Sequence, residues 1–214
     1  MNGRRFPDGS RVQAIVNAGN GRDTLLGGPG SDVIFAGNNG DTIFGGDGND
    51  VIYGGRGNDF VDAGPGNDRI FDDHGDDILM GGDGNDLIID RRGDNILLGG
   101  SGNDTILGGR GRDLIIGGAG RDLLFGGDDE DLLIGGETEY DNDQHALNLI
   151  LSEWTRSTPH RRRRQHIMDG TGKLNETGIR LNSQPVHEDE ERDLLIGGCG
   201  LDLVFEGILD DVLN

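Results

Sequence analysis

Aspartate recurs at a spacing of nine residues through most of this 214-residue chain. Cut into nine-residue units from residue 18, the chain gives thirteen consecutive units up to residue 134, and three more if an interruption splits the fourteenth. The sixth position is Asp in fifteen of these sixteen units, with Asn95 as the exception. An array of carboxylates supplies hard oxygen ligands, which are the ligands that Ca²⁺ takes from proteins. The single cysteine, Cys199, excludes both an intramolecular disulfide and a thiolate metal cluster.

Each aspartate needs a turn that presents it and a strand that follows it. Glycine crowds the first, second and fourth positions of the units, and the eighth position is Leu, Ile or Val in all sixteen. Because glycine tolerates positive φ angles, such a stretch can form a tight turn whose carbonyl groups point to one side. The aliphatic and β-branched residues that follow suit a short strand with its eighth-position side chain inward. Stacked units would then bury a continuous narrow core, which one unit cannot do alone.

The composition excludes several classes of protein. Glycine accounts for 42 residues, hydrophobic residues for 32%, and the formal charge is −21. So few apolar residues do not build a conventional layered core, because ordering each residue costs about 1.5 kcal/mol of conformational entropy. The acidity argues against binding to phosphate backbones or anionic membranes and favours a cationic partner. No apolar run is long enough for a membrane span, and residues 1–19 lack the apolar stretch of a secretory signal peptide.

Two consecutive units are expected to make one turn of a flattened coil, so that each unit stacks on the second unit before it. The two edges of the coil are then lined by Asp23, Asp41, Asp59 and Asp77, and by Asp32, Asp50, Asp68 and Asp86. Thirteen uninterrupted units give 13 − 2, or eleven, gaps between a unit and the unit stacked on it, and eleven divalent ions would carry +22 against the −21 of the chain. Mg²⁺ fits less well than Ca²⁺, because it keeps its waters and needs stricter octahedral geometry. The repulsion between the aspartates therefore predicts a chain that folds only when calcium binds between its layers.

The candidate calcium ligands come from two parts of the unit. The carboxylates of the sixth position are those of Asp23, Asp32, Asp41, Asp50, Asp59, Asp68, Asp77, Asp86, Asp104, Asp113, Asp122 and Asp131. The carbonyl oxygens of the turns are those of Gly28, Gly30, Gly46, Gly48, Gly55, Gly57, Gly64, Gly66, Gly82, Gly84, Gly100, Gly102, Gly109 and Gly111.

The pattern Gly-Gly-x-Gly-x-Asp-x-(Leu/Ile/Val/Phe)-x resembles the nonapeptide of the RTX, or hemolysin-type calcium-binding, family. Units such as Gly45-Gly46-Asp47-Gly48-Asn49-Asp50-Val51-Ile52-Tyr53 carry the resemblance, which covers residues 18–136 and 191–214. The resemblance implies an all-β fold, a parallel β-roll with several Ca²⁺ ions held between turns by the Asp carboxylates and turn carbonyls. Type I secretion and folding on meeting extracellular calcium are typical of the family.

Three turns depart from the pattern. Asp72-Asp73-His74 and Asp90-Arg91-Arg92 replace the opening glycines of two units, and the second of these units also has Asn95. Asp128-Asp129-Glu130 alters the turn before the interruption. Weak or absent calcium binding is expected at these three places.

The pattern divides the chain into four segments. Residues 1–17 are expected to form an N-terminal cap, because residues 9–17 resemble a degenerate unit. The β-roll follows over residues 18–136, a helical insertion over 137–190, and the final β-roll units over 191–214. In the insertion, Leu147, Ile150, Leu151 and Trp154 have the spacing of one helical face, which predicts an amphipathic helix over residues 141–154. Thr158-Pro159 predicts the start of a second helix, with Gly170 beyond its end.

The arginine run of the insertion, Arg161 to Arg164, has three interpretations. It is a solvated helix face, a clamp on the acidic turns of the roll, or a site for an anion or polysaccharide. The histidines of the insertion lie in no HExxH pattern, so exposed or helix-packing roles are favoured for them. The stretch from Asp131 to Asp202 also resembles a C-terminal module that closes many large secreted bacterial RTX-like proteins.

The ninth position is apolar in fourteen of the sixteen units and is expected to face outward. Helices of the insertion are expected to cover a few of these side chains near the C-terminal end of the roll. The others would leave an apolar face, which is explained either by packing between neighbouring side chains or by an interaction surface.

Three functions compete. The favoured one is a non-enzymatic, secreted calcium-binding module whose folding is coupled to calcium, with no nucleic-acid partner and no membrane span. The alternative is a calcium-dependent adhesin or surface-layer component, associated with the cell surface, whose apolar face binds itself, another protein or a glycan. An enzyme is disfavoured, because the chain has neither a Gly-x-Ser-x-Gly nor an HExxH pattern and little length outside the repeats.

Overall fold

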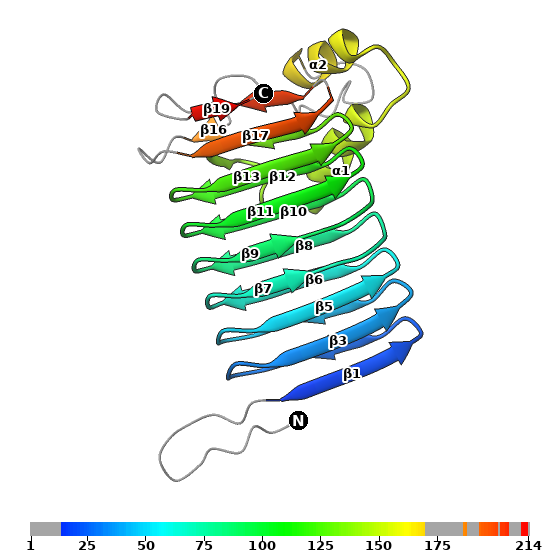
Figure 1. Cartoon of the computed structure of the whole chain (residues 1–214), viewed down its shortest axis with the longest axis vertical. Helices are drawn as coiled ribbons and strands as arrows, with labels where there is room; N and C mark the ends of the chain where they lie inside the picture. The colour runs from blue at the N-terminus through cyan, green and yellow to red at the C-terminus, as the bar shows by residue number, and fades with distance from the viewer. Residues whose placement is uncertain (1–13, 170–185, 188–192, 201, 206–210, 214) are drawn as a thin grey trace.

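The strands of the repeat form two parallel sheets, which are the two walls of a flattened coil (Figure 1). The computed structural model describes residues 14–169, 186–187, 193–200, 202–205 and 211–213. Within these residues, the nine-stranded sheet contains β1 (Ile15–Asn20), β3 (Val33–Asn38), β5 (Val51–Arg56), β7 (Arg69–Phe71), β9 (Leu87–Ile89), β11 (Thr105–Arg110), β13 (Leu123–Asp128), β17 (Leu194–Cys199) and β19 (Asp211–Leu213). The eight-stranded sheet contains β2 (Thr24–Leu26), β4 (Thr42–Phe44), β6 (Phe60–Pro65), β8 (Ile78–Asp83), β10 (Ile96–Ser101), β12 (Leu114–Ala119), β14 (Leu132–Ile134) and β18 (Leu203–Phe205). The predicted parallel β-roll is confirmed.

The register of the strands shows how the units stack. In the pair β3 and β5, Ile34 lies opposite Ile52, eighteen residues further along the chain. Two nine-residue units therefore make one turn of the coil, as the spacing predicts. Across the interruption, Leu124 of β13 lies opposite Leu195 of β17, so the chain resumes the same register after the insertion. The insertion thus splits one unit of the roll.

The eighth-position side chains fill the interior of the coil. From Ile34 to Leu133, and again at Leu195, each of them is 0% exposed, and together they form one continuous core. Small residues at the first position also face inward, including Ala36 and Ala63. The alternation of inward and outward side chains follows from the period of two in a strand. The side chains of two further eighth-position residues, Val204 and Leu213, lie outside the described part of the chain.

The insertion leaves the roll and returns to it at one place. Its first strand, β15 (Glu137–Thr138), pairs antiparallel with β16 (Val186–His187). Between them lie α1 (Gln144–Trp154) and α2 (His160–Asp169), at the C-terminal end of the roll (Figure 1). The helix predicted over residues 141–154 is confirmed with a later start, because the side chain of Asp143 accepts the N–H of Ala146 at 3.0 Å and caps α1. The second predicted helix is confirmed directly after Pro159, whereas Gly170 lies outside the described residues.

Helix α1 covers the outer face of the eight-stranded sheet near its C-terminal end. Its buried side chains pack in one cluster with seventh- and ninth-position side chains of four neighbouring strands, which confirms that the insertion covers part of the apolar face. This second core contains Ile96, Leu98, Leu114, Ile116, Leu132, Ile134, Ala146, Leu147, Ile150, Leu151, Trp154, Ile167 and Leu203. The alternating sheet therefore has two apolar faces here, one on the interior and one under the helix.

The arginine run divides between two of its interpretations. Arg163 is 2% exposed and forms an ion pair with Glu130, which lies in the acidic turn before the insertion. It also donates to the carbonyl of Trp154 at 2.8 Å, and its guanidinium lies 5.2 Å from the centre of that indole ring. The other three arginines of the run are exposed. One residue of the run is therefore a clamp on an acidic turn, and the rest form a solvated helix face.

The expected N-terminal cap contributes to the roll. Ile15–Asn17 belong to β1, and Val16 lies opposite Ile34 in the register of the repeat. Residues 1–13 of the predicted cap lie outside the described residues. The strands β17, β18 and β19 pair with the roll, and the bounds 191–214 of the final units stay a prediction. Among the described residues, neither helix has the length and apolar character needed to cross a membrane.

Candidate metal centre

The sixth-position aspartates form two columns, one at each edge of the coil. In each column, one oxygen of the side chain, Oδ1, accepts the N–H of the sixth-position residue eighteen positions earlier, with distances of 2.6–3.0 Å. The columns continue across the insertion, because Asp122 donates to Asp193 and Asp131 donates to Asp202. The first column contains Asp23, Asp41, Asp59, Asp77, Asn95, Asp113, Asp131 and Asp202. The second contains Asp32, Asp50, Asp68, Asp86, Asp104, Asp122 and Asp193.

The other carboxylate oxygen, Oδ2, is buried without a hydrogen-bond donor in most members of the columns. These members are Asp32, Asp41, Asp50, Asp59, Asp68, Asp77, Asp86, Asp104, Asp113 and Asp131. Each of these residues is at most 3% exposed. Burial of an ionised carboxylate is costly unless a proton, a donor or a cation meets it. Asp23, at the N-terminal end of its column, is only half-buried.

The predicted glycine ligands all lie in turns of one kind. Each of the fourteen has a positive φ, from 89° at Gly109 to 156° at Gly66, which L-residues with side chains adopt at a cost. A Cβ atom added to Gly46 would overlap the carbonyl oxygen of Gly28 in the layer before, and one on Gly48 would overlap that of Gly30. The second- and fourth-position carbonyls therefore point into the gap between two layers, as the repeat predicts.

The first position of the turn places oxygen atoms around a small space. At Gly45, a Cβ atom would overlap both Oδ2 of Asp50 and the carbonyl oxygen of Ala63 in the next layer. The same pair of neighbours recurs at Gly99, Gly108 and Gly117, where the carboxylate belongs to the turn itself and the carbonyl to the following layer. Carboxylate and carbonyl oxygens that face one another repel unless a cation lies near both. The donor set is entirely oxygen and fits a hard cation such as Ca²⁺.

Burial opposes the ionisation of the carboxyl groups in the columns. Loss of hydration raises the pKa of Asp50 and of Asp86 to about 6, and that of Asp68 and of Asp104 to about 7. The N–H that each one accepts lowers the pKa by a smaller amount, and neighbouring carboxylates of the column raise it further. Without a cation, the folded chain thus holds these groups in a less favourable state than water does.

Asn95 shows what the turn does when the sixth position carries no carboxylate. Its Oδ1 accepts the N–H of Asp77 at 3.0 Å, as an aspartate would, so the column of hydrogen bonds continues. Its Nδ2 donates to the carbonyl of Gly93 at 3.1 Å. An amide can make this second contact and a carboxylate cannot, because the carboxylate has no proton to donate. The expected weak calcium binding at this turn agrees with these contacts and stays a prediction.

The turn before the insertion uses different partners. Asp129 occupies the fourth position with a φ of 79°, where the other twelve units before the insertion have glycine or asparagine. Glu130 is held by Arg163, and its Oε2 lies 3.5 Å from Nε of Arg112. The charge of this acidic turn is therefore partly met by arginine, so weak calcium binding remains the expectation there.

Two features of the columns were not predicted from the sequence. The fifth position forms an exposed ladder in which the N–H of one asparagine donates to Oδ1 of the asparagine before it; its members are Asn49, Asn67, Asn85 and Asn103. Their recurrence at a spacing of eighteen was the available signal. The second feature is Asp72 and Asp90 at the first position, where both side chains are buried. The inward direction of the first position was the signal for these two.

Comparison with known proteins agrees with the geometry of the columns. Residues 15–43, 35–70, 53–88, 71–106 and 107–137 match the RTX calcium-binding nonapeptide repeat. No curated protein matches the chain. The matched residues span more than half of the chain and contain both columns up to the insertion. This chain therefore belongs to the family of RTX calcium-binding nonapeptide repeat proteins.

Proposed function

We propose that this chain is a non-enzymatic calcium-binding β-roll that folds when several Ca²⁺ ions bind between its layers. One observation carries the proposal, namely the columns of buried aspartates whose second oxygen has no hydrogen-bond donor. A buried carboxylate in this state is stabilised by a cation that reaches it. The ligands are the carboxylates of the two columns and the carbonyl oxygens of the second and fourth positions of the turns.

Calcium is the ion that this donor set favours. The site offers carboxylate and backbone carbonyl oxygens from two layers, and Ca²⁺ accepts six to eight such ligands in flexible geometry. Mg²⁺ requires near-octahedral geometry and gives up its waters reluctantly, so a crowded gap between two layers suits it less. Zinc and copper prefer nitrogen and sulfur ligands, which the columns do not contain.

Binding to the folded state alone makes calcium a folding switch. The chain carries −21 charges, and stacking the aspartates concentrates that charge at the two edges of the coil. An ion that binds only the folded chain stabilises it in proportion to the logarithm of its concentration over its dissociation constant. Extracellular calcium modules have dissociation constants of about 10⁻⁴–10⁻³ M. We therefore place the working form of the chain outside the cell, where the family is typically secreted and calcium is abundant.

Far-UV circular dichroism during a calcium titration tests this proposal. The chain in chelator is expected to give the spectrum of an unfolded polypeptide, and millimolar Ca²⁺ is expected to produce a strand spectrum cooperatively. Mg²⁺ at the same concentrations is the control and is expected to leave most of the chain unfolded. An unchanged strand spectrum in excess chelator would exclude calcium-coupled folding.

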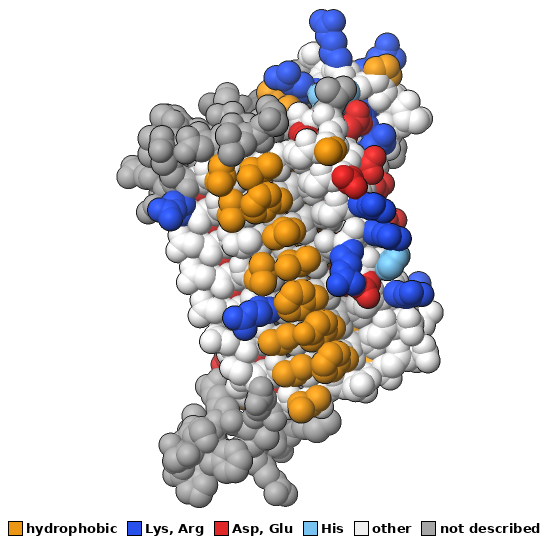
Figure 2. Space-filling model, viewed as in Figure 1, with side chains coloured by type: hydrophobic (Ala, Val, Ile, Leu, Met, Phe, Trp, Pro, Cys, Tyr) orange, Lys and Arg blue, Asp and Glu red, His pale blue; other side chains and the backbone are white. Residues whose placement is uncertain are grey.

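A second function is favoured by the outer face of the nine-stranded sheet. Figure 2 shows hydrophobic side chains in a continuous stripe along this face. Phe35 stacks on Tyr53 with ring centres 4.8 Å apart, Tyr53 stacks on Phe71 at 5.2 Å, and the first two side chains are 38% and 39% exposed. Such a row suits an adhesin or surface-layer component that binds a protein or a glycan. Calcium-dependent light scattering separates self-association from an inert module, and Tyr53→Ser is expected to abolish any association through the stripe.

A further inference from the structure

We propose that Asp59, Asp72 and Asp77 form a calcium site of a different construction from the other turns, and that it is the tightest site of the roll. Asp72 occupies the first position of its unit, where the nonapeptide has glycine and where no carboxylate ligand is expected. The inference rests on the proposed function for the identity of the ion. It concerns a ligand that the repeat pattern does not contain.

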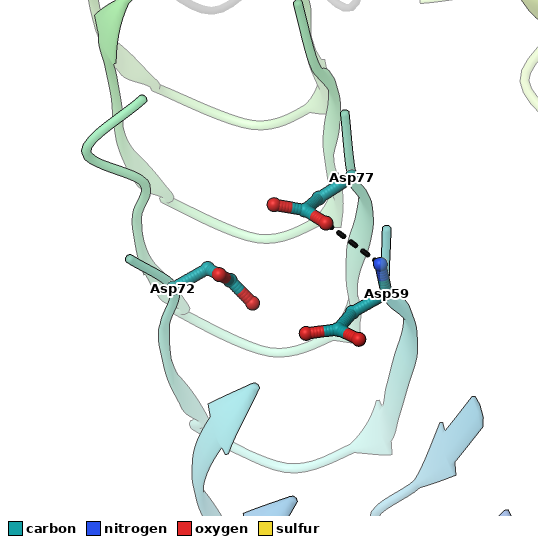
Figure 3. A group of neighbouring side chains, drawn as sticks. All are labelled: Asp59, Asp72 and Asp77. Carbon is teal, nitrogen blue, oxygen red and sulfur yellow. Dashed lines mark hydrogen bonds between the residues drawn. The ribbon is translucent and has the colours of Figure 1, made fainter. Parts of the chain in front are cut away.

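The three carboxylates lie together inside the coil. Asp59 and Asp72 are each 3% exposed and Asp77 is 1% exposed. Each residue contributes one oxygen to a group in which all the atoms lie within 4.8 Å of one another. Figure 3 shows Asp72 extending across the interior toward Asp59 and Asp77, which come from the opposite wall in adjacent layers. A cation at the centre of this group would reach all three side chains.

The direction of Asp72 follows from its position in the unit. The first position faces inward, as the fully buried Ala36 and Ala63 show. One oxygen of Asp72, Oδ1, accepts the N–H of Asp73 at 2.6 Å, which fixes the carboxylate plane. The other, Oδ2, has no hydrogen-bond donor, and neither has Oδ2 of Asp59 or of Asp77. A Cβ atom on Gly54, in the layer before, would overlap Oδ2 of Asp72 and lie 3.0 Å from that of Asp59. Two of the unpartnered oxygens therefore face the same space.

No basic side chain inside the roll neutralises this group. Among the described residues, Arg163 is the buried arginine, and it lies in α2 on Glu130. Arg91, from the following layer, pairs with Asp73 instead, and these two side chains are 70% and 46% exposed. Three buried carboxylates without a counter-charge demand a cation more strongly than the sixth-position carboxylates of an ordinary gap do. Calcium affinity rises with the number of charged ligands, so this gap is expected to bind Ca²⁺ first.

The next layer also carries a carboxylate at its first position. Asp90 also occupies a first position, is 2% exposed, and has an Oδ2 without a donor, while its own unit has lost the sixth-position carboxylate to Asn95. A carboxylate has thus moved from one side of the turn to the other. The geometry and the repeat pattern therefore predict opposite effects of glycine at position 72 on calcium affinity. By the pattern alone, glycine at position 72 improves a calcium site, whereas by this geometry it removes a ligand.

Two substitutions that both restore glycine test the inference. Asp72→Gly removes the inward carboxylate, and Asp73→Gly removes the exposed carboxylate next to it, so each variant loses one charge from the same turn. Calcium is titrated into the full-length chain in competition with a chromophoric chelator, and circular dichroism in saturating calcium checks the fold. The dissociation constant of the tightest ion is expected to rise about tenfold in Asp72→Gly and to stay within about twofold in Asp73→Gly. Asp72→Asn keeps the size of the side chain and removes its charge, and it is expected to match Asp72→Gly.

The outcomes of this experiment distinguish a failure of the inference from a failure of the proposed function. Equal or tighter binding by both Asp72→Gly and Asp72→Asn, compared with the wild-type chain, would overturn the inference while the proposed function stands. If Asp72→Gly does not fold in saturating calcium, Asp72→Asn supplies the comparison. A wild-type chain that binds no Ca²⁺ in the same titration would instead overturn the proposed function itself.

Discussion

Each buried aspartate of the two columns uses its two oxygens differently. Oδ1 accepts an N–H from the layer before, which any acceptor of the same length can do, as Asn95 demonstrates. Oδ2 lacks a donor in ten of these aspartates and is the oxygen that we propose to bind calcium. The hydrogen bond and the charge can therefore be separated by substitution at one position.

Asp104→Asn is expected to separate them. Asp104 accepts the N–H of Asp86 at 2.7 Å, and an asparagine Oδ1 can replace that acceptor. The variant should lose much of the calcium-dependent rise in melting temperature that this gap provides, but keep the fold in saturating calcium. Asp104→Ala is the matched control, because it also leaves the Asp86 N–H without an acceptor and should cost a further 1–3 kcal/mol or so. Melting curves with and without calcium check both, and an Asp104→Asn curve identical to wild type at every calcium concentration would contradict the assignment.

At this scale the sequence predicts the positions of the column aspartates better than their surroundings. The aspartate spacing alone placed the residues of both columns and paired them eighteen residues apart. Asp72 and Asp90 were interpreted only as lost glycines, because a pattern of residue types does not show that a substituted position faces inward. Asn95 was predicted as a lost ligand, and the structure adds that its amide donates to Gly93.

At the scale of elements, the strands and the helices are predicted from different signals in the sequence. The strands follow from a repeat whose units carry the same residue types at the same positions. Their register was therefore predictable across the insertion. Helix α1 was predictable from the spacing of Leu147, Ile150, Leu151 and Trp154, all of which are buried. The docking of the insertion on the roll was less predictable than helix α1 itself, because Glu130 and Arg163 are thirty-three residues apart and meet only in the folded chain.

Arg163→Met is expected to weaken the docking of the insertion. The substitution keeps an unbranched apolar stem but removes the ion pair with Glu130 and the hydrogen bond to the Trp154 carbonyl. Breaking a largely buried pair costs about 3 kcal/mol, because the carboxylate of Glu130 loses its closer partner and keeps only Arg112 at 3.5 Å. Unfolding by urea in saturating calcium measures the cost, followed by the fluorescence of Trp154, the one tryptophan of the chain.

The matched control for this change is Arg162→Met. Arg162 belongs to the same run and helix but is exposed, so its substitution should change stability by no more than about 0.5 kcal/mol. Equal effects of the two substitutions would show that the run acts through its overall charge. The clamp on Glu130 would then be unimportant for stability.

At the scale of the whole molecule, the two columns make folding depend on pH. Carboxyl groups whose pKa is raised by burial bind protons more tightly in the folded than in the unfolded chain. Stability without metal therefore falls as the pH rises from about 4, the unfolded value, through the folded values of about 6 to 7. Protons and calcium compete for the same oxygens, so acid can partly replace the ion.

The metal-free chain is thus expected to contain more strand structure at pH 5 than at pH 8. Circular dichroism in metal-stripped buffer at the two pH values measures the difference directly. Saturating calcium should reverse the order, because the ion binds the ionised carboxylates that are present at pH 8. A metal-free chain that is more ordered at pH 8 than at pH 5 would show that the columns do not oppose ionisation.

The most direct measurement is anomalous diffraction at long wavelength from a crystal of the full chain grown in calcium. Calcium scatters anomalously under these conditions, so each ion can be located without assumptions about its ligands. Peaks are expected between successive layers along both edges of the coil, next to Oδ2 of the column aspartates, with a strong peak among Asp59, Asp72 and Asp77. Ordered layers with no anomalous density beside these oxygens would contradict the proposed calcium binding.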